Sequence, residues 1–156
     1  MKLAGRIEIA TSADRLWAMV NDPLGLAGCV PGVGDVRRVD ERTFGGSVSA
    51  AVGPIEGTFE FTAVIARSDF PSDLTVQLEG VDSVTKSQLV AVVQSSLELL
   101  DPRRTALAYS AVITVKGRLE ILGDMILRAT ASVIISELVK CLKARLEPPV
   151  GALATS

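Results

Sequence analysis

The sequence predicts an α+β fold in which a curved antiparallel sheet of about seven strands wraps around a long C-terminal helix, with two short helices after the first strand. Three observations support this prediction. Residues 36–115 alternate apolar and polar side chains in segments separated by short turns, as adjacent antiparallel strands do. Residues 118–146 place apolar side chains at helical spacing. The first thirty residues combine one alternating segment with two short helical ones.

The N-terminal segment predicts one strand and two short helices. Residues 2–9 alternate with period two, which is typical of a half-buried strand. Thr11 or Ser12 is expected to cap the first helix, because a hydroxyl oxygen accepts a hydrogen bond from a free amide of the first turn. Pro23 favours a new helix start, and that second helix is expected to end near Gly28.

The central segment predicts a meander of strands with one apolar face. The best alternating segments are 44–52, 55–65, 74–78, 89–97 and 107–115. Turn sequences are expected at 40–42, 53–54, 70–73, 80–82 and 101–104. A twisted sheet of this size curls, so its apolar face and the last helix should enclose a hydrophobic chamber that the two short helices close at one end.

The C-terminal helix has more apolar surface than one contact needs. At ~1.5 Å per residue it would be ~43 Å long. One apolar row consists of Leu122, Ile126, Ala129 and Val133. A second row consists of Leu127, Ile134, Leu138 and Cys141. The solvent side is expected at Arg128, Ser132, Ser136 and Lys143. The sheet can shield only one of these rows from water. The other row therefore indicates a cavity or a partner in addition to the sheet.

Composition predicts a single domain over residues 1–147, followed by a disordered tail at 148–156. The 16 basic and 18 acidic residues are scattered, and aromatic residues make up only 4%, so nucleic acid is not expected as a partner. The N-terminus does not read as a secretory signal, and the charge-free stretch of the last helix is short. Both indicate a cytoplasmic protein without a membrane span.

The side-chain chemistry argues against an enzyme. The chain has no histidine, which removes the commonest general base and metal ligand, and no residue is assigned a catalytic or metal-binding role. No resident cofactor is expected. Cys29 and Cys141 are interpreted as free buried thiols, with a long-range disulfide as the alternative. Glu56 and Glu60 lie on the polar side of their strand, where a solvated face is the simpler interpretation.

The order of elements resembles the helix-grip folds of the START and birch-pollen-allergen (SRPBCC) superfamily. Within it, the sequence is similar to the G-subunit family of carbon monoxide dehydrogenase at Trp17, Asp22-Pro23, Leu26, Cys29-Val30-Pro31-Gly32, Gly53-Pro54-Ile55, 115–119 and Leu122-Gly123. This resemblance implies an accessory protein of a molybdenum hydroxylase, such as carbon monoxide dehydrogenase, that helps mature the enzyme or attach it to the inner face of the cytoplasmic membrane.

The candidate site is the wall of the predicted chamber. Trp17 and Tyr109 each combine apolar bulk with one hydrogen-bond donor, which suits a mostly hydrocarbon ligand with one or two polar atoms, although both could simply fill the core. Cys29 would lie at the mouth, where packing is the first interpretation of its thiol. The expected lining is Trp17, Leu26, Cys29, Val30, Phe59, Phe61, Leu78, Leu89, Ala91, Val93, Tyr109, Ala111, Ile126, Ala129 and Val133.

Three functions remain open from the sequence. The first is a noncatalytic module that binds a hydrophobic molecule, such as a membrane quinone or lipid, with peripheral membrane contact. The second is a cyclase or dehydratase of hydrophobic substrates, for which the inward faces offer only Tyr109 and Ser95. The third is a ligand-free interaction subunit or homodimer that uses Val90 and Val92, or the second helix row, as its contact.

Overall fold

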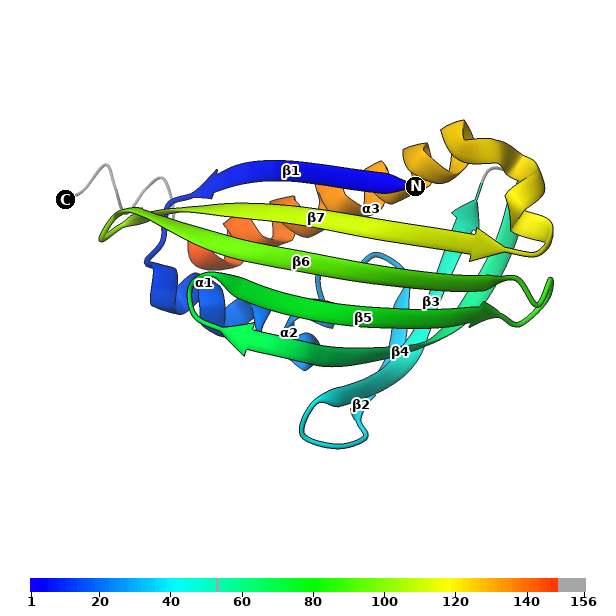
Figure 1. Ribbon diagram of the computed structural model, residues 1–156, viewed down its shortest axis with the longest axis horizontal. Helices are drawn as coiled ribbons and strands as arrows, with labels where there is room; N and C mark the ends of the chain where they lie inside the picture. The colour runs from blue at the N-terminus through cyan, green and yellow to red at the C-terminus, as the bar shows by residue number, and fades with distance from the viewer. Residues whose placement is uncertain (53, 149–156) are drawn as a thin grey trace.

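A computed structural model describes residues 1–52 and 54–148, which form one seven-stranded sheet with the helices on one of its faces (Figure 1). The strands are β1 (Lys2–Ile9), β2 (Val33–Arg38), β3 (Thr43–Val52), β4 (Ile55–Asp69), β5 (Asp73–Asp82), β6 (Gln88–Asp101) and β7 (Arg104–Lys116). The helices are α1 (Ala13–Val20), α2 (Pro23–Ala27), the 3₁₀ helix η1 (Arg118–Leu122) and α3 (Gly123–Leu146). The predicted fold class is confirmed. The predicted tail lies outside the described residues from 149 onward.

The sheet is antiparallel throughout and strongly curved. Its strands follow the order β1-β7-β6-β5-β4-β3-β2, so β1 and β2 form the two edges. Register shifts interrupt the pairing after Val33, Ile65 and Leu99, and such bulges bend a strand and increase its twist. Figure 1 shows β2 and β3 crossing β6 and β7 at a steep angle. The concave face is therefore the one on which the helices lie.

The N-terminal helices form where the sequence predicts them. Of the two candidate caps, Ser12 is the residue used, since its Oγ accepts a hydrogen bond from the backbone amide of Arg15 at 3.3 Å. Pro23 is the first residue of α2. Gly32 has a φ of +79°, and a Cβ there would meet the carbonyl oxygen of Ser49, so the turn before β2 requires glycine.

The turn predicted at residues 80–82 was placed too early. β5 continues to Asp82, and the turn to β6 follows it at residues 83–86. The carboxylate of Asp82 closes this turn by accepting hydrogen bonds from the amide and hydroxyl of Thr85. Gly80 resembles a turn residue in the sequence, but in the sheet it is buried and lies opposite Phe61 on β4.

The continuous helix predicted over residues 118–146 is also corrected. Residues 118–122 form η1, and Gly123, with a φ of +82°, separates it from α3. Only glycine adopts this backbone conformation readily, so the chain changes direction there. With 24 residues, α3 is about 36 Å long by its rise per residue, shorter than the predicted rod.

Two buried clusters hold the helices against one end of the sheet. In the first, α1 packs with the ends of β1, β6, β7 and α3: Ile9, Ala13, Leu16, Leu97, Leu107, Leu142 and Leu146. The second lies on β3, β4 and β5: Phe44, Ala63, Ile65 and Leu74. Trp17 and Val20 of α1 contact both clusters. This end of the fold is consequently dry and closed by α1.

Candidate functional site

The middle of the concave face is incompletely filled. Next to the two buried clusters, the inward side chains form rows that run across neighbouring strands. One such row consists of Leu78, Ala91 and Ile113. Many of these side chains are only half-buried: Phe59, Phe61, Val76, Leu78, Leu89, Val93, Tyr109, Ile113 and Val115. Close packing against α3 would bury them as fully as Phe44, which is 1% exposed. We call this set the apolar band.

The structure brings the sheet residues of the predicted lining together. Phe59, Phe61, Leu78, Leu89 and Val93 belong to the apolar band, as does Tyr109. Ala91 and Ala111 lie in the same rows and are buried. Period-two alternation places them all on one side of the sheet, as the sequence predicts. Their role as the wall of a ligand site stays a prediction.

The three helix residues of the predicted lining differ in their exposure to solvent. Ile126 is half-buried, but Ala129 is exposed and Val133 keeps 61% of its surface exposed. The row that turns inward contains Leu127, Ile134 and Leu138, all half-buried. Placing Ala129 and Val133 on the chamber wall was therefore wrong. Only one arc of α3 can face the sheet, and the other apolar row is left exposed at Ala129 and Val133.

The predicted lining residues near α1 and α2 lie at the closed end. Trp17 packs against both buried clusters and makes an edge-to-face contact with Phe70 at a centroid distance of 5.4 Å. Leu26 packs against the first cluster, and Val30 is half-buried. Trp17 thus fills the core, which was the alternative to ligand contact.

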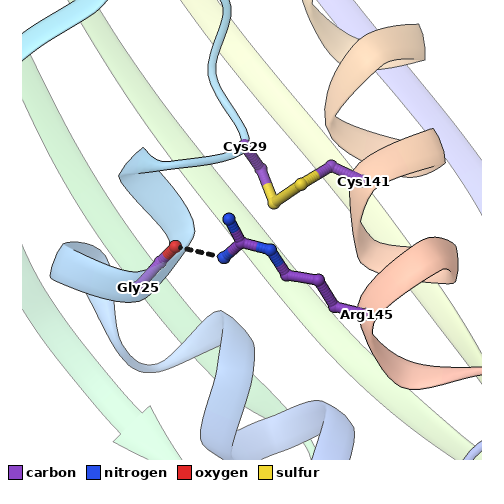
Figure 2. Close-up of a disulfide and its surroundings, with 4 residues drawn as sticks. All are labelled: Gly25, Cys29, Cys141 and Arg145. Atoms are coloured by element: carbon purple, nitrogen blue, oxygen red, sulfur yellow. Dashed lines mark hydrogen bonds between the residues drawn. A yellow bond between two sulfur atoms is a disulfide. The ribbon is translucent and has the colours of Figure 1, made fainter.

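Cys29 and Cys141 form a disulfide, so the interpretation as free thiols was wrong and its alternative holds. Their Cα atoms are 5.4 Å apart, and the bond joins the second residue after α2 to the last third of α3 (Figure 2). Arg145 makes a second connection: its Nη1 donates to the carbonyl oxygen of Gly25 at 2.9 Å. No buried side chain holds α2 in place, so these two connections fasten it to α3.

The seam between β1–β7 and α3 is open at two places. A groove of about 400 Å³ follows the second half of α3 and is lined by Leu3, Ala4, Tyr109, Ser132, Ile135, Ser136, Val139, Lys140 and Lys143. A pocket of about 270 Å³ lies beneath the first turn of α3 and is lined by Met1, Ile113, Thr114, Val115, Glu120, Gly123, Asp124 and Leu127. Both openings contain residues of the apolar band, so they lead to the concave face.

Arg128 crosses the seam between the two openings. Its Nη1 donates to the carbonyl oxygen of Lys2 at 2.8 Å, and its Nε donates to a carboxylate oxygen of Asp124 at 3.4 Å. Arg128 was expected on the solvent side and is exposed, as are Ser132 and Ser136. That this face of α3 borders the openings could not be predicted, because helical spacing does not show which arc lies next to a sheet edge.

Tyr109 lies across Gly5 on the neighbouring strand. The two residues are paired in register, and a Cβ on Gly5 would meet the Tyr109 hydroxyl. We expect Gly5→Ala to force the ring aside and to lower the free energy of unfolding by about 1–3 kcal/mol. Thermal unfolding of Gly5→Ala, Tyr109→Ala and the double variant tests this. Costs that simply add would show that the ring and Gly5 do not interact.

Asp82 is the buried carboxyl group that sequence reasoning missed. It is 1% exposed, and its Oδ1 has no hydrogen-bond partner among the described residues. Hydrogen bonds from Thr85 lower its pKa despite the opposing effect of burial. Asp82 is therefore ionised at neutral pH, which suits closing a turn better than donating a proton.

The lowered pKa of Asp82 predicts an acid dependence of stability. Because the folded pKa lies below the unfolded value of about 3.9, this contribution is complete above that value and is lost as the pH falls through the folded pKa. We expect Asp82→Asn to cost about 1–2 kcal/mol at pH 7. The difference between variant and wild type should shrink on acidification. A difference that is unchanged down to the acid limit would contradict this.

No catalytic or metal centre is evident in the described part of the chain. Within residues 1–52 and 54–148, no three His, Cys, Asp or Glu side chains lie close enough together to hold a metal ion. Ser95 and Tyr109 are paired on β6 and β7 and are the hydroxyl groups of the inward rows next to the apolar band. A search of the helices in the same residues finds none long and apolar enough to cross a membrane.

Comparison with protein families assigns most of the chain to one family. The model of the family described as the G subunit of carbon monoxide dehydrogenase (CoxG) matches residues 5–147. A comparison with curated proteins gives no match.

Solved structures share the fold. A conserved protein from Geobacillus kaustophilus has a TM-score of 0.85 and 18% identity, with 93% of this chain and 94% of that chain covered. A START superfamily protein from Mycobacterium smegmatis has a TM-score of 0.70 and 16% identity, with 94% and 97% covered. The Zhui aromatase/cyclase from Streptomyces sp. R1128 has a TM-score of 0.66 and 13% identity, with 93% and 92% covered. At these identities the likeness concerns the fold.

Proposed function

The chain belongs to the CoxG family of carbon monoxide dehydrogenase G subunits, and from that premise we propose that it is a noncatalytic accessory protein that holds a hydrophobic small molecule on the concave face of its sheet. The START-like fold supports the proposal, because it places a long helix across a curved sheet. The ligand would lie between the apolar band and the inward arc of α3.

The observation that supports this most directly is the half-buried state of the apolar band. Apolar surface left in contact with water costs roughly 25 cal/mol per Å² compared with burial. The nine large inward side chains of the apolar band are half-buried, whereas the clusters directly beside them are fully buried. A bound hydrophobic molecule would bury the remaining surface of the band. The two openings of the seam provide routes to it.

The chemistry of the band indicates the class of guest. Its surface is hydrocarbon except for the hydroxyls of Tyr109 and the neighbouring Ser95. Such a site favours a molecule that is mostly apolar with one or two polar atoms. A membrane quinone or another lipid fits this description, and a quinone is the natural choice beside a redox enzyme.

We propose a molybdenum hydroxylase of the carbon monoxide dehydrogenase type as the partner, at the inner face of the cytoplasmic membrane. The family description names the dehydrogenase, and this supports the proposed partnership. Affinity purification of the tagged chain from its native host should recover the hydroxylase subunits together with it. Recovery of the chain without them under mild, detergent-free conditions would count against the partnership.

The experiment that tests ligand binding is extraction of the purified protein. Native mass spectrometry of protein prepared without detergent should show a noncovalent adduct, and solvent extraction should release a quinone or lipid from it. Protein that is empty, and that also fails to bind a neutral apolar dye or a short-chain quinone, would overturn the proposal.

A second candidate function is a cyclase-type enzyme. The aromatase/cyclase neighbour shares the fold, and the register pairing of Ser95 on β6 with Tyr109 on β7 is the observation that favours it. Neither residue has a described base beside it, so this candidate is weaker. Tyr109→Phe separates the two functions, because it should abolish turnover in an enzyme and only modestly change the affinity of a binding module.

A further inference from the structure

Three strongly exposed apolar side chains gather at the end of the sheet opposite α1. Ile121 of η1 is 85% exposed, Met125 in the first turn of α3 is 84% exposed, and Val84 in the turn between β5 and β6 is 72% exposed. The amide of Leu119 donates to the Oγ of Ser87 at 3.1 Å, which fastens η1 beside that turn. Figure 1 shows both segments at the same end of the molecule. We call these three side chains the apolar tip.

The two segments that carry the apolar tip also contain several cationic residues. Within residues 83–87 and 116–128 the cations are Lys86, Lys116, Arg118 and Arg128, against the carboxylates Glu120 and Asp124. Both carboxylates have partners, since Glu120 accepts a hydrogen bond from the amide of Gly117 and Asp124 pairs with Arg128. In the described residues, Lys86, Lys116 and Arg118 are exposed and make no ion pair. Two further carboxylates border the turn: Asp82, which accepts hydrogen bonds from Thr85, and the exposed Glu56 at the start of β4. Among the described residues, the exposed charges without an ion pair at this end are therefore three cations against Glu56, and this balance favours an anionic surface.

We propose that the apolar tip inserts into the surface of a bilayer that contains anionic lipids. Exposed apolar side chains with cations beside them are the pattern of proteins that lie on such membranes. A protein partner fits less well, because three protruding side chains cannot supply the roughly 800 Å² that each side of a standard interface buries. A bilayer needs no matching shape and accepts such a convex tip.

The position of the tip also explains how a ligand reaches the concave face. The pocket beneath the first turn of α3 adjoins Met125 and η1 and contains Ile113, Val115 and Leu127. An apolar molecule could pass from the bilayer through this opening, past Glu120 and Asp124 at its rim, to the apolar band. This second step rests on the proposed function, whereas docking of the tip does not.

Vesicle sedimentation tests the docking. The wild-type chain should sediment with vesicles of phosphatidylcholine containing phosphatidylglycerol, and less with phosphatidylcholine alone or at high salt. The variant Ile121→Asp/Met125→Asp should bind at least about tenfold more weakly, because it replaces inserted apolar groups by charges. Lys86→Glu should weaken binding to the anionic vesicles by about threefold or more. The matched control is Val39→Asp, since Val39 is 60% exposed on the turn between β2 and β3.

The outcomes separate docking from ligand binding. Unchanged fluorescence of Trp17, which lies at the other end of the fold, and an unchanged melting temperature will show that the variants are folded. Equal sedimentation of wild type and the Ile121→Asp/Met125→Asp variant, or no sedimentation of either, overturns the docking. A dimer that this variant dissociates would also overturn it, because a second copy then occupies the tip. Docking by a protein that never binds an apolar ligand would instead overturn the proposed function alone.

Discussion

Replacing Cys29 and Cys141 together by serine is expected to lower the free energy of unfolding by about 4–5 kcal/mol and the melting temperature by roughly 10–15 °C. The disulfide joins residues 112 positions apart, so it restricts most of the unfolded chain. It is also one of the two connections between α2 and α3, the other being the hydrogen bond from Arg145 to Gly25. Calorimetry or far-ultraviolet circular dichroism during heating measures the loss.

Reductant supplies the control for this prediction. Wild type treated with a strong dithiol should melt near the temperature of the serine variant, whereas the variant should not respond. A wild type that melts at the same temperature with and without reductant would contradict a stabilising disulfide. Alkylation of free thiols in intact cells before lysis measures the fraction of the protein in which Cys29 and Cys141 are disulfide-bonded in the cell. Disulfides are rare in the cytoplasm, so this fraction also tests the proposed cytoplasmic location.

The cysteines show what sequence reasoning missed and why. Cys29 has only apolar sequence neighbours, and neither cysteine has a second cysteine nearby, which favours a packing role. Their pairing depends on how the loop after α2 meets α3, and local spacing does not contain that information. One local signal was available: Arg145 follows Cys141 by four residues, so both lie on one face of α3.

The sheet was predicted better than the helix for a physical reason. In a strand, period two fixes which side chains share a face, so Phe61, Ala91 and Tyr109 could be assigned to the concave side. In α3, apolar side chains cover more than one arc, and the helical period then does not show which arc is inward. The buried residues Leu142 and Leu146 were missed, while the exposed Val133 was assigned to the wall.

Val93→Trp is expected to weaken binding of the hydrophobic ligand by roughly 100-fold, about 2.7 kcal/mol. Val93 lies in the apolar band beside Val76 and Ala111, so an indole there would occupy the space assigned to the guest. The matched control is Val92→Trp on the same strand, which points to the convex face and is 40% exposed. Titration with a neutral apolar dye or a short-chain quinone measures both variants. Equal affinities would place the ligand elsewhere.

The same pair of variants also tests whether the space exists. If the band faced a packed interior, the tryptophan of Val93→Trp would overfill it and cost about 1–3 kcal/mol or more. Since Val93 is only half-buried, we expect the indole to enter open space and the melting temperature to stay near that of wild type or rise. Val92→Trp also tests the convex face of the sheet as a protein-binding surface. Val90, Val92 and Val112 are exposed on this face. If Val92→Trp alone loses a protein complex while ligand binding stays intact, the chain is a docking subunit.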